Sequence, residues 1–269
     1  SGMGIDLPHV MFLPTFAASA WYHDALADKP ENLEAFMEEV EQFSLQEYAP
    51  ALLMGQRLPD QQRQQVIARL SRYTGLSEDY WNSANLRISE AQFTKELLRN
   101  RAETVGRVDS RFKGDTINLL GERAFYDPFG SAIGPPFLAA FMDYYRSDLN
   151  VKTDQEYVVS GKLWMHWDWG HAQPDLGGFK APFPNTLVDL SLTMKQNPNM
   201  KVLYQQGYFD LATPHLATEY YIDHMDITPA LRENVSLKMY EAGHMMYIHE
   251  PSMAKYKKDL AEFVRGSYQ

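Results

Sequence analysis

An aspartate and a histidine each follow an expected strand in the last quarter of the chain. The first strand pattern ends at Gly207 and Asp210, and the second, at residues 235–240, ends at Gly243 and His244. Active sites of α/β proteins lie where the carboxyl ends of parallel strands meet, so we expect the two side chains to be hydrogen-bond neighbours. Such a carboxylate orients the imidazole and stabilises its protonated form while the ring acts as general base and acid.

The order of this pair matches the last two members of an α/β-hydrolase triad, in which a serine comes first. That serine belongs in a G-x-S-x-G turn, and the pentapeptide occurs nowhere in the 269 residues. Ser131 has glycine neighbours, but their spacing is wrong and no strand pattern precedes it. The alternative is structural, with Asp210 capping the helix that begins near Thr213 and His244 a hydrogen-bonded loop residue. We interpret the chain as the C-terminal portion of a hydrolase that lacks its nucleophile half.

Helical patterns dominate before the two strands. Apolar residues recur at spacings of three and four within residues 15–104, and the pattern that starts at Ser89 is a capping box. Residues 105–135 are rich in glycine and predict a long loop or hairpin, whereas 135–149 and 186–197 predict helices. Two strands cannot make a stable doubly wound sheet by themselves, because a parallel sheet must be covered on both faces, and this is a second indication that strands are missing.

These patterns predict an α/β fold, specifically a partial α/β hydrolase. We expect residues 1–195 to form a large, mostly helical lid or insertion. Residues 196–269 are then expected to supply the last two βα units of the core sheet.

Composition narrows the classes of partner. The net charge of −10 disfavours a nucleic-acid binder, which would need a basic face. No apolar run approaches the 18 residues of a membrane span, so no membrane partner is expected. The absence of cysteine excludes disulfides, thiol catalysis and thiolate metal sites. No signal peptide opens the chain, although one would have been lost with a missing N-terminal half.

Longer motifs point to a family. The segments GYFDLATPHLATEYYIDHM and YEAGHMMYIHEPSMAKYKKDLAEF resemble the C-terminal end of the bacterial branch of the serine carboxypeptidase family. LPHVMFLPTFAASAWYH, TVGRVDSRF and DPFGSAIGPPFLAAFMDYYRSDL resemble segments of that branch that follow the nucleophile and form the insertion. The resemblance covers essentially all of residues 5–266 and is most specific in the final 70.

The resemblance implies that Asp210, in G-Y-x-D, and His244, in G-H-M, complete a catalytic triad. It also implies that Met245 lines the pocket near the end of the substrate, although a plain apolar filler explains that methionine equally well. The G-E-S-Y-G motif, the oxyanion-hole glycines and the Asn and Glu that bind the substrate's terminal carboxylate have no counterpart here. The chain by itself is therefore expected to be inactive.

The implied function is that of a serine-type carboxypeptidase, releasing C-terminal residues from peptides through an acyl-enzyme. The substrate is then a peptide or a small acyl compound, no cofactor or metal is implied, and a periplasmic or secreted location is favoured. One alternative is an esterase or acyltransferase of the same fold. Others are a pseudoenzyme and a non-catalytic lid or binding module, with self-association through the incomplete sheet.

Two further groups have structural and functional interpretations. His166, Asp168 and His171 have ligand types that suit a metal, but an aromatic loop with hydrogen-bonded polar groups explains them better. Trp164, Trp167 and Trp169 suit either the wall of a substrate cleft or, as we favour, the core of a lid.

Overall fold

A computed structural model describes residues 5–174, 177–182 and 184–267. Helices account for 54% of the structure and strands for 8%, so the chain is a mostly helical α/β protein, as expected at this level. None of the helices in the described part of the chain combines the length and apolar character that a membrane span requires.

The described residues form two compact units. The first unit takes its residues from 1–133, 203–220 and 237–269, and the second from 134–202 and 221–236. The boundary predicted between residues 195 and 196 does not coincide with this division. The physical reason is burial: Phe209, Leu211 and Leu216 belong to the same hydrophobic core as the N-terminal helices.

Helices form most of the first unit before residue 102. They are α1 (Leu7–Tyr22), α2 (Leu33–Phe43), the π-helical turn η1 (Ser44–Tyr48), α3 (Ala49–Met54), the 3₁₀ turn η2 (Gly55–Arg57), α4 (Asp60–Thr74), α5 (Glu78–Ser83), α6 (Glu90–Glu96) and the 3₁₀ turn η3 (Arg99–Arg101).

Local signals explain several of these boundaries. The Asn32 side chain caps α2 by accepting a hydrogen bond from the Ala35 N–H at 2.9 Å. Helix α4 ends at Gly75, whose φ of +71° is a left-handed conformation that glycine adopts without strain. The predicted capping box is confirmed, because Ser89 and Gln92 exchange side-chain and backbone hydrogen bonds at the start of α6.

The expected hairpin after residue 102 is short. Strands β1 (Glu103–Val105) and β2 (Lys113–Asp115) pair antiparallel, with Glu103 opposite Asp115. Their connection, residues 106–112, is longer than a tight turn.

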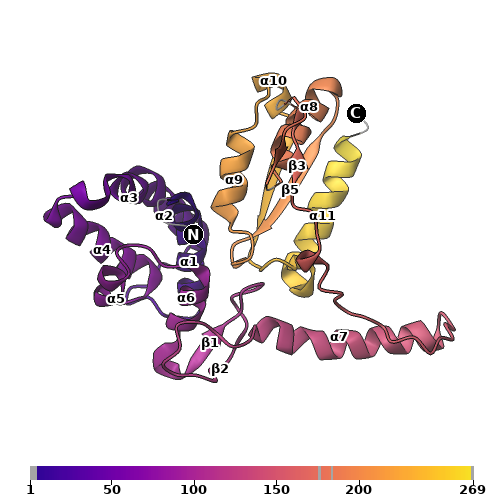
Figure 1. Cartoon of the computed structure of the whole chain (residues 1–269), viewed down its shortest axis with the longest axis horizontal. Coiled ribbons are helices and arrows are strands. Elements are labelled where there is room, and N and C mark those ends of the chain that lie inside the picture. The colour runs from indigo at the N-terminus through magenta and orange to yellow at the C-terminus, as the bar shows by residue number, and fades with distance from the viewer. Residues whose placement is uncertain (1–4, 175–176, 183, 268–269) are drawn as a thin grey trace. The chain divides into compact units, whose positions relative to one another are not determined.

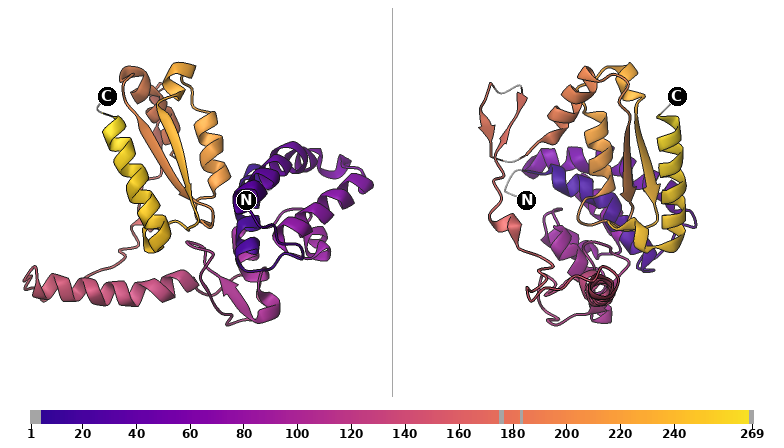
Figure 2. Two further views of the ribbon diagram at one scale, coloured as in Figure 1. Left: turned by 180° about the vertical axis from the view of Figure 1, so that it is seen from behind. Right: turned by 90° about the vertical axis from the view of Figure 1, so that its right-hand side faces the viewer.

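The strands predicted near the C-terminus are β5 (Val202–Gly207) and β6 (Val235–Tyr240), which form a two-stranded sheet. Val202 N–H donates to Asn234 O, and Tyr208 N–H donates to Tyr240 O. Both partners advance together along the chain, so the strands are parallel. Helices α9 (His215–Asp223) and α11 (Glu250–Gly266) lie on opposite sides of the pair (Figures 1 and 2). The 3₁₀ turn η6 (Met246–Ile248) precedes α11.

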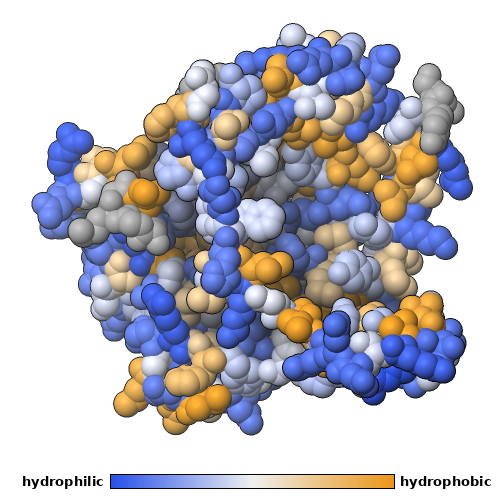
Figure 3. Space-filling view, turned by 45° about the vertical axis from the view of Figure 1, so that its right-hand side comes forward, coloured by the Kyte–Doolittle hydropathy of each residue, from blue (hydrophilic) through white to orange (hydrophobic). Residues whose placement is uncertain are grey.

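The second unit holds most of α7 (Pro128–Ser147) and several smaller elements. These are η4 (Leu163–Met165), β3 (His171–Ala172), β4 (Lys180–Ala181), α8 (Thr186–Gln196) and α10 (Pro229–Arg232). Large hydrophobic side chains are exposed here, including Phe137 on α7, and Figure 3 shows such groups among hydrophilic ones on the surface. Trp164, Trp167 and Trp169 are also at least half exposed, so the expectation that they form a lid core is wrong.

Candidate functional site

Asp210 lies just beyond β5, and its buried carboxylate accepts hydrogen bonds from several groups. Oδ1 accepts from the backbone N–H groups of Ala212 at 2.8 Å and Thr213 at 2.9 Å. Oδ2 accepts from the Thr213 hydroxyl at 2.6 Å and the Gln206 amide at 3.3 Å, and lies 2.8 Å from His244 Nδ1. These donors offset the cost of burying the carboxylate and fix its plane. Asp210 therefore organises the turn before α9, as the structural alternative proposes, and also contacts the histidine.

His244 lies in the corresponding position beyond β6. The contact with Asp210 makes Nδ1 the protonated nitrogen of the neutral ring, because a carboxylate oxygen is an acceptor. Nε2 then carries a lone pair. Among the hydrogen bonds of the described residues, none engages Nε2, and 51% of the side chain is exposed. The expected proximity of Asp210 and His244 is confirmed, and Nε2 is left without a hydrogen-bond partner among the described residues.

Gly207 and Gly243 allow neighbouring segments to approach closely, and neither is needed for an unusual backbone conformation. Neither is among the glycines with positive φ in the described structure. A Cβ on Gly207 would lie 2.2 Å from Ala242 O, and one on Gly243 would lie 2.4 Å from Asp109 Cβ. The glycines therefore let the two strand ends and a neighbouring loop pack close enough for Asp210 and His244 to meet.

Met245 is partly buried beside His244, whereas the next residue, Met246, is 8% exposed and packs with Tyr240 and Ala242. Met246 is therefore an apolar core residue at this turn. The pocket-lining role of Met245 stays a prediction.

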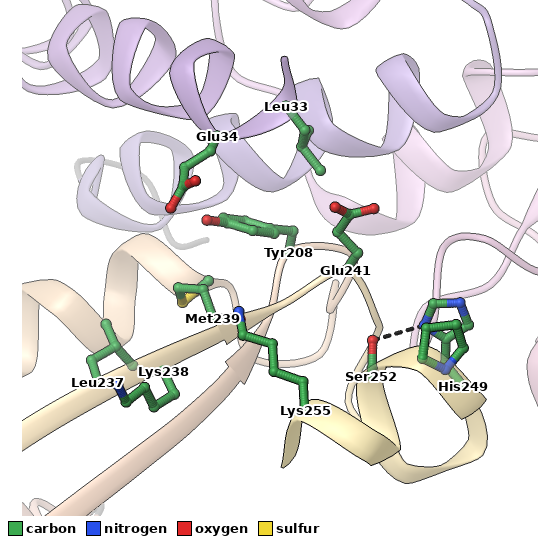
Figure 4. Close-up of a pocket in the computed structure, with 11 residues that line it drawn as sticks. Leu33, Glu34, Tyr208, Leu237, Lys238, Met239, Glu241, His249, Ser252 and Lys255 are labelled. Atoms are coloured by element: carbon green, nitrogen blue, oxygen red, sulfur yellow. Dashed lines mark hydrogen bonds between the residues drawn. The ribbon is translucent and has the colours of Figure 1, made fainter. Parts of the chain in front are cut away.

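A pocket of about 480 Å³ lies near the site, but neither Asp210 nor His244 lines it (Figure 4). Tyr208, Glu34, Glu241 and Lys255 are among the residues that line it, as are His249 and Ser252, whose Nδ1 and Oγ atoms lie 2.7 Å apart. Burial raises the pKa of Tyr208 above its ordinary value, and the surrounding carboxylates add to this rise. Burial also lowers the pKa of His249, so a neutral ring is favoured there.

The metal interpretation of His166, Asp168 and His171 is not supported by their contacts. Asp168 pairs with Lys180, and His171 Nε2 lies 2.9 Å from Asp189. Asp168 and His171 therefore use separate partners.

A different group has the spacing of metal ligands. Ligand atoms of Glu41, His215 and Glu219 lie within 4.8 Å of one another. The buried His215 ring bonds Thr15 through Nδ1 at 3.2 Å and Glu41 through Nε2 at 3.0 Å. Because these two hydrogen bonds already satisfy both ring nitrogens, the group needs no ion to be stable.

Sequence reasoning did not predict the hydrogen bonds that Thr213 and Gln206 donate to Asp210, or the contacts of Asp109 and Arg111 with the site. The Thr213 hydroxyl had a local signal, since a Thr three residues after an Asp is a common turn partner. Asp109 and Arg111 reach the site from a distant loop, and no local pattern indicates that contact.

Comparison with protein-family models, with curated proteins and with solved structures finds no match to this chain. The resemblance to serine carboxypeptidases therefore rests on the motifs of the sequence. The geometry of Asp210 and His244 is an observation independent of that resemblance.

Proposed function

We propose that this chain is the C-terminal part of a serine carboxypeptidase-like hydrolase with an α/β-hydrolase fold. The observation that carries the proposal is the 2.8 Å contact between Asp210 Oδ2 and His244 Nδ1 at the ends of two parallel strands. In an acid–histidine–serine triad the acid holds Nδ1 in this way, and Nε2 takes the proton of the serine hydroxyl. Nε2 belongs to a half-exposed side chain and has no hydrogen-bond partner among the described residues, so it is available for that role.

The proposed chemistry assigns a role to each residue. His244 would accept the serine proton as Oγ attacks the substrate carbonyl, then deliver it to the departing amine, leaving an acyl-enzyme. In the second half His244 would take a proton from water as the water oxygen attacks the acyl carbon, and would return that proton to the serine oxygen as the ester bond breaks. Asp210 would stabilise the imidazolium in both halves. The serine and the oxyanion donors would come from strands outside these 269 residues.

The two-stranded sheet agrees with this proposal. Parallel strands normally occur in larger sheets that are covered on both faces. Strands β5 and β6 are the whole of their sheet within the described residues. Further strands beside them would complete the sheet and supply the nucleophile.

The test uses the source reading frame extended upstream of Ser1. We expect a G-x-S-x-G motif there and labelling of the extended protein by a fluorophosphonate probe, with release of C-terminal residues from blocked dipeptides. His244→Ala should abolish turnover, and Asp210→Asn should lower it by about 10⁴ because the ring would adopt the wrong tautomer.

His166→Ala, an exposed histidine of the second unit, is the matched control and should retain activity. The 269-residue chain should not be labelled. Labelling of that chain that is lost in His244→Ala would show that a serine within it is the nucleophile. An extended form without labelling or turnover would refute the catalytic proposal and favour a binding module.

A further inference from the structure

We infer that the loop at residues 108–111 is the positioning element that holds Asp210 and His244 at hydrogen-bond distance; the inference rests on the proposed function. The loop lies between β1 and β2, and its backbone bonds both strand ends. Ser110 N–H donates to Phe209 O at 3.0 Å, and His244 N–H donates to Val108 O at 2.9 Å. Phe209 immediately precedes Asp210, so one loop fixes the main chain beside both members of the pair.

A buried ion pair strengthens the contact with the histidine segment. The Arg111 guanidinium donates from Nε and Nη2 to the two carboxylate oxygens of Asp109, at 2.9 and 2.6 Å. The Asp109 side chain is fully buried and that of Arg111 is 8% exposed. Asp109 Oδ2 also accepts from the Gly243 N–H at 3.2 Å, and Arg111 Nη1 donates to Glu241 O at 3.1 Å.

The loop is itself fixed to α1. Ser110 Oγ lies 2.6 Å from Ser19 Oγ, and the Ser110 carbonyl accepts from His23 Nε2 at 2.6 Å. Burial lowers the pKa of His23, which favours the neutral ring that makes this bond. The 108–111 loop therefore links the helical core to the main chain beside Asp210 and His244.

The strands alone do not fix the histidine. The last backbone hydrogen bond between the two strand ends joins Phe209 N–H to Ala242 O. Beyond it, the described backbone hydrogen bonds of Gly243 and His244 go to the 108–111 loop. Asp109 and Arg111 act through His244 without contacting a substrate, so they are positioning residues.

The first test uses the 269-residue chain labelled with ¹⁵N. Native-state hydrogen exchange should show the amides of Ser110 and His244 protected as strongly as that of Tyr208, which bonds between the strands. Unprotected amides at both positions in the folded parent chain would overturn the inference without any substitution.

The second test releases the loop while keeping the fold. Asp109→Asn alone would leave the buried Arg111 unpaired, so the double variant Asp109→Asn/Arg111→Met removes both charges. Asp6→Asn/Arg87→Met is the matched control, because Asp6 and Arg87 form a similar two-bond pair away from the site. Exchange of the His244 Nδ1–H proton should accelerate on the order of tenfold in the first variant, as expected for a lost hydrogen bond, and stay unchanged in the control.

The outcomes separate the two proposals. A folded Asp109→Asn/Arg111→Met chain with the parent's Nδ1–H exchange would overturn the positioning role. If the parent shows the protected Nδ1–H proton but the extended protein gives no labelling, the proposed function fails while the positioning role stands. In an active extended form, the double variant should lower kcat and leave KM nearly unchanged, because it displaces His244 and not the substrate.

Discussion

Replacing Gly207 by alanine should separate Asp210 from His244. A Cβ at this position would lie 2.2 Å from Ala242 O and 2.5 Å from Gly243 O. Carbon and oxygen atoms in a sheet approach to about 3.3 Å, so the strand ends must move apart by roughly 1 Å. The clashing oxygens of Ala242 and Gly243 are backbone atoms, so no side-chain rotation can relieve the overlap.

The loss of stability can be estimated from the backbone hydrogen bonds that join the two strand ends. Tyr208 N–H to Tyr240 O and Phe209 N–H to Ala242 O are both 3.0 Å long, and an opening of that size would break them. Each bond contributes about 0.5–1.5 kcal/mol net, so the free energy of unfolding should fall by about 1–3 kcal/mol. The 2.8 Å contact between Asp210 and His244 should be lost as well.

Urea unfolding gives the free energy, and exchange of the His244 Nδ1–H proton reports the contact. Gly130→Ala is the control, since Gly130 lies in helix α7 with no atom within 4 Å of an added Cβ. The control should match the parent or be up to about 1 kcal/mol more stable, because alanine is the better helix former. A Gly207→Ala chain with the stability and Nδ1–H protection of the parent would refute the close-approach argument.

Two other predictions concern the core that supports the site. Phe209→Ala removes a side chain that is 1% exposed, so urea unfolding should show a loss of about 3–5 kcal/mol in the free energy of unfolding. Phe125→Ala, at a side chain that is 77% exposed, is the control. Equal losses of stability in both variants would contradict the reasoning. Burial lowers the pKa of His23 below 6.5, so the unfolded chain binds its proton more readily and stability falls as the pH drops from about 6.5 towards the folded pKa. Unfolding midpoints at pH 5 and 7.5 should therefore differ less in His23→Gln than in the parent, and an unchanged difference would rule out His23 as the group responsible.

Sequence reasoning succeeded where the determinants are local. The capping box at Ser89 and the bounds of β6 follow from residues close together in the chain. The Asp210–His244 contact was also predictable, because parallel strands bring their carboxyl ends to one edge of the sheet.

Contacts between distant segments were not predictable in this way. Phe209 and Leu211 resemble ordinary strand-end residues, yet they are buried in the helical core and cause the division of units to differ from the predicted boundary. Asp109 and Arg111 stand in a glycine-rich stretch that predicted only a loop or hairpin. Their pairing with Gly243 and Glu241 depends on tertiary packing, which local periodicity does not encode.

The contact between the 108–111 loop and the strand ends has a consequence for the order of folding. Asp109 and Gly243 are 134 positions apart, whereas Asp6 and Arg87, which pair within the helical region, are 81 positions apart. Closing a longer loop costs more chain entropy, and distant contacts form later than local ones. During synthesis the N-terminal helices leave the ribosome long before β6 does. We therefore expect His244 to reach Asp210 in one of the last steps of folding, after the helices have formed.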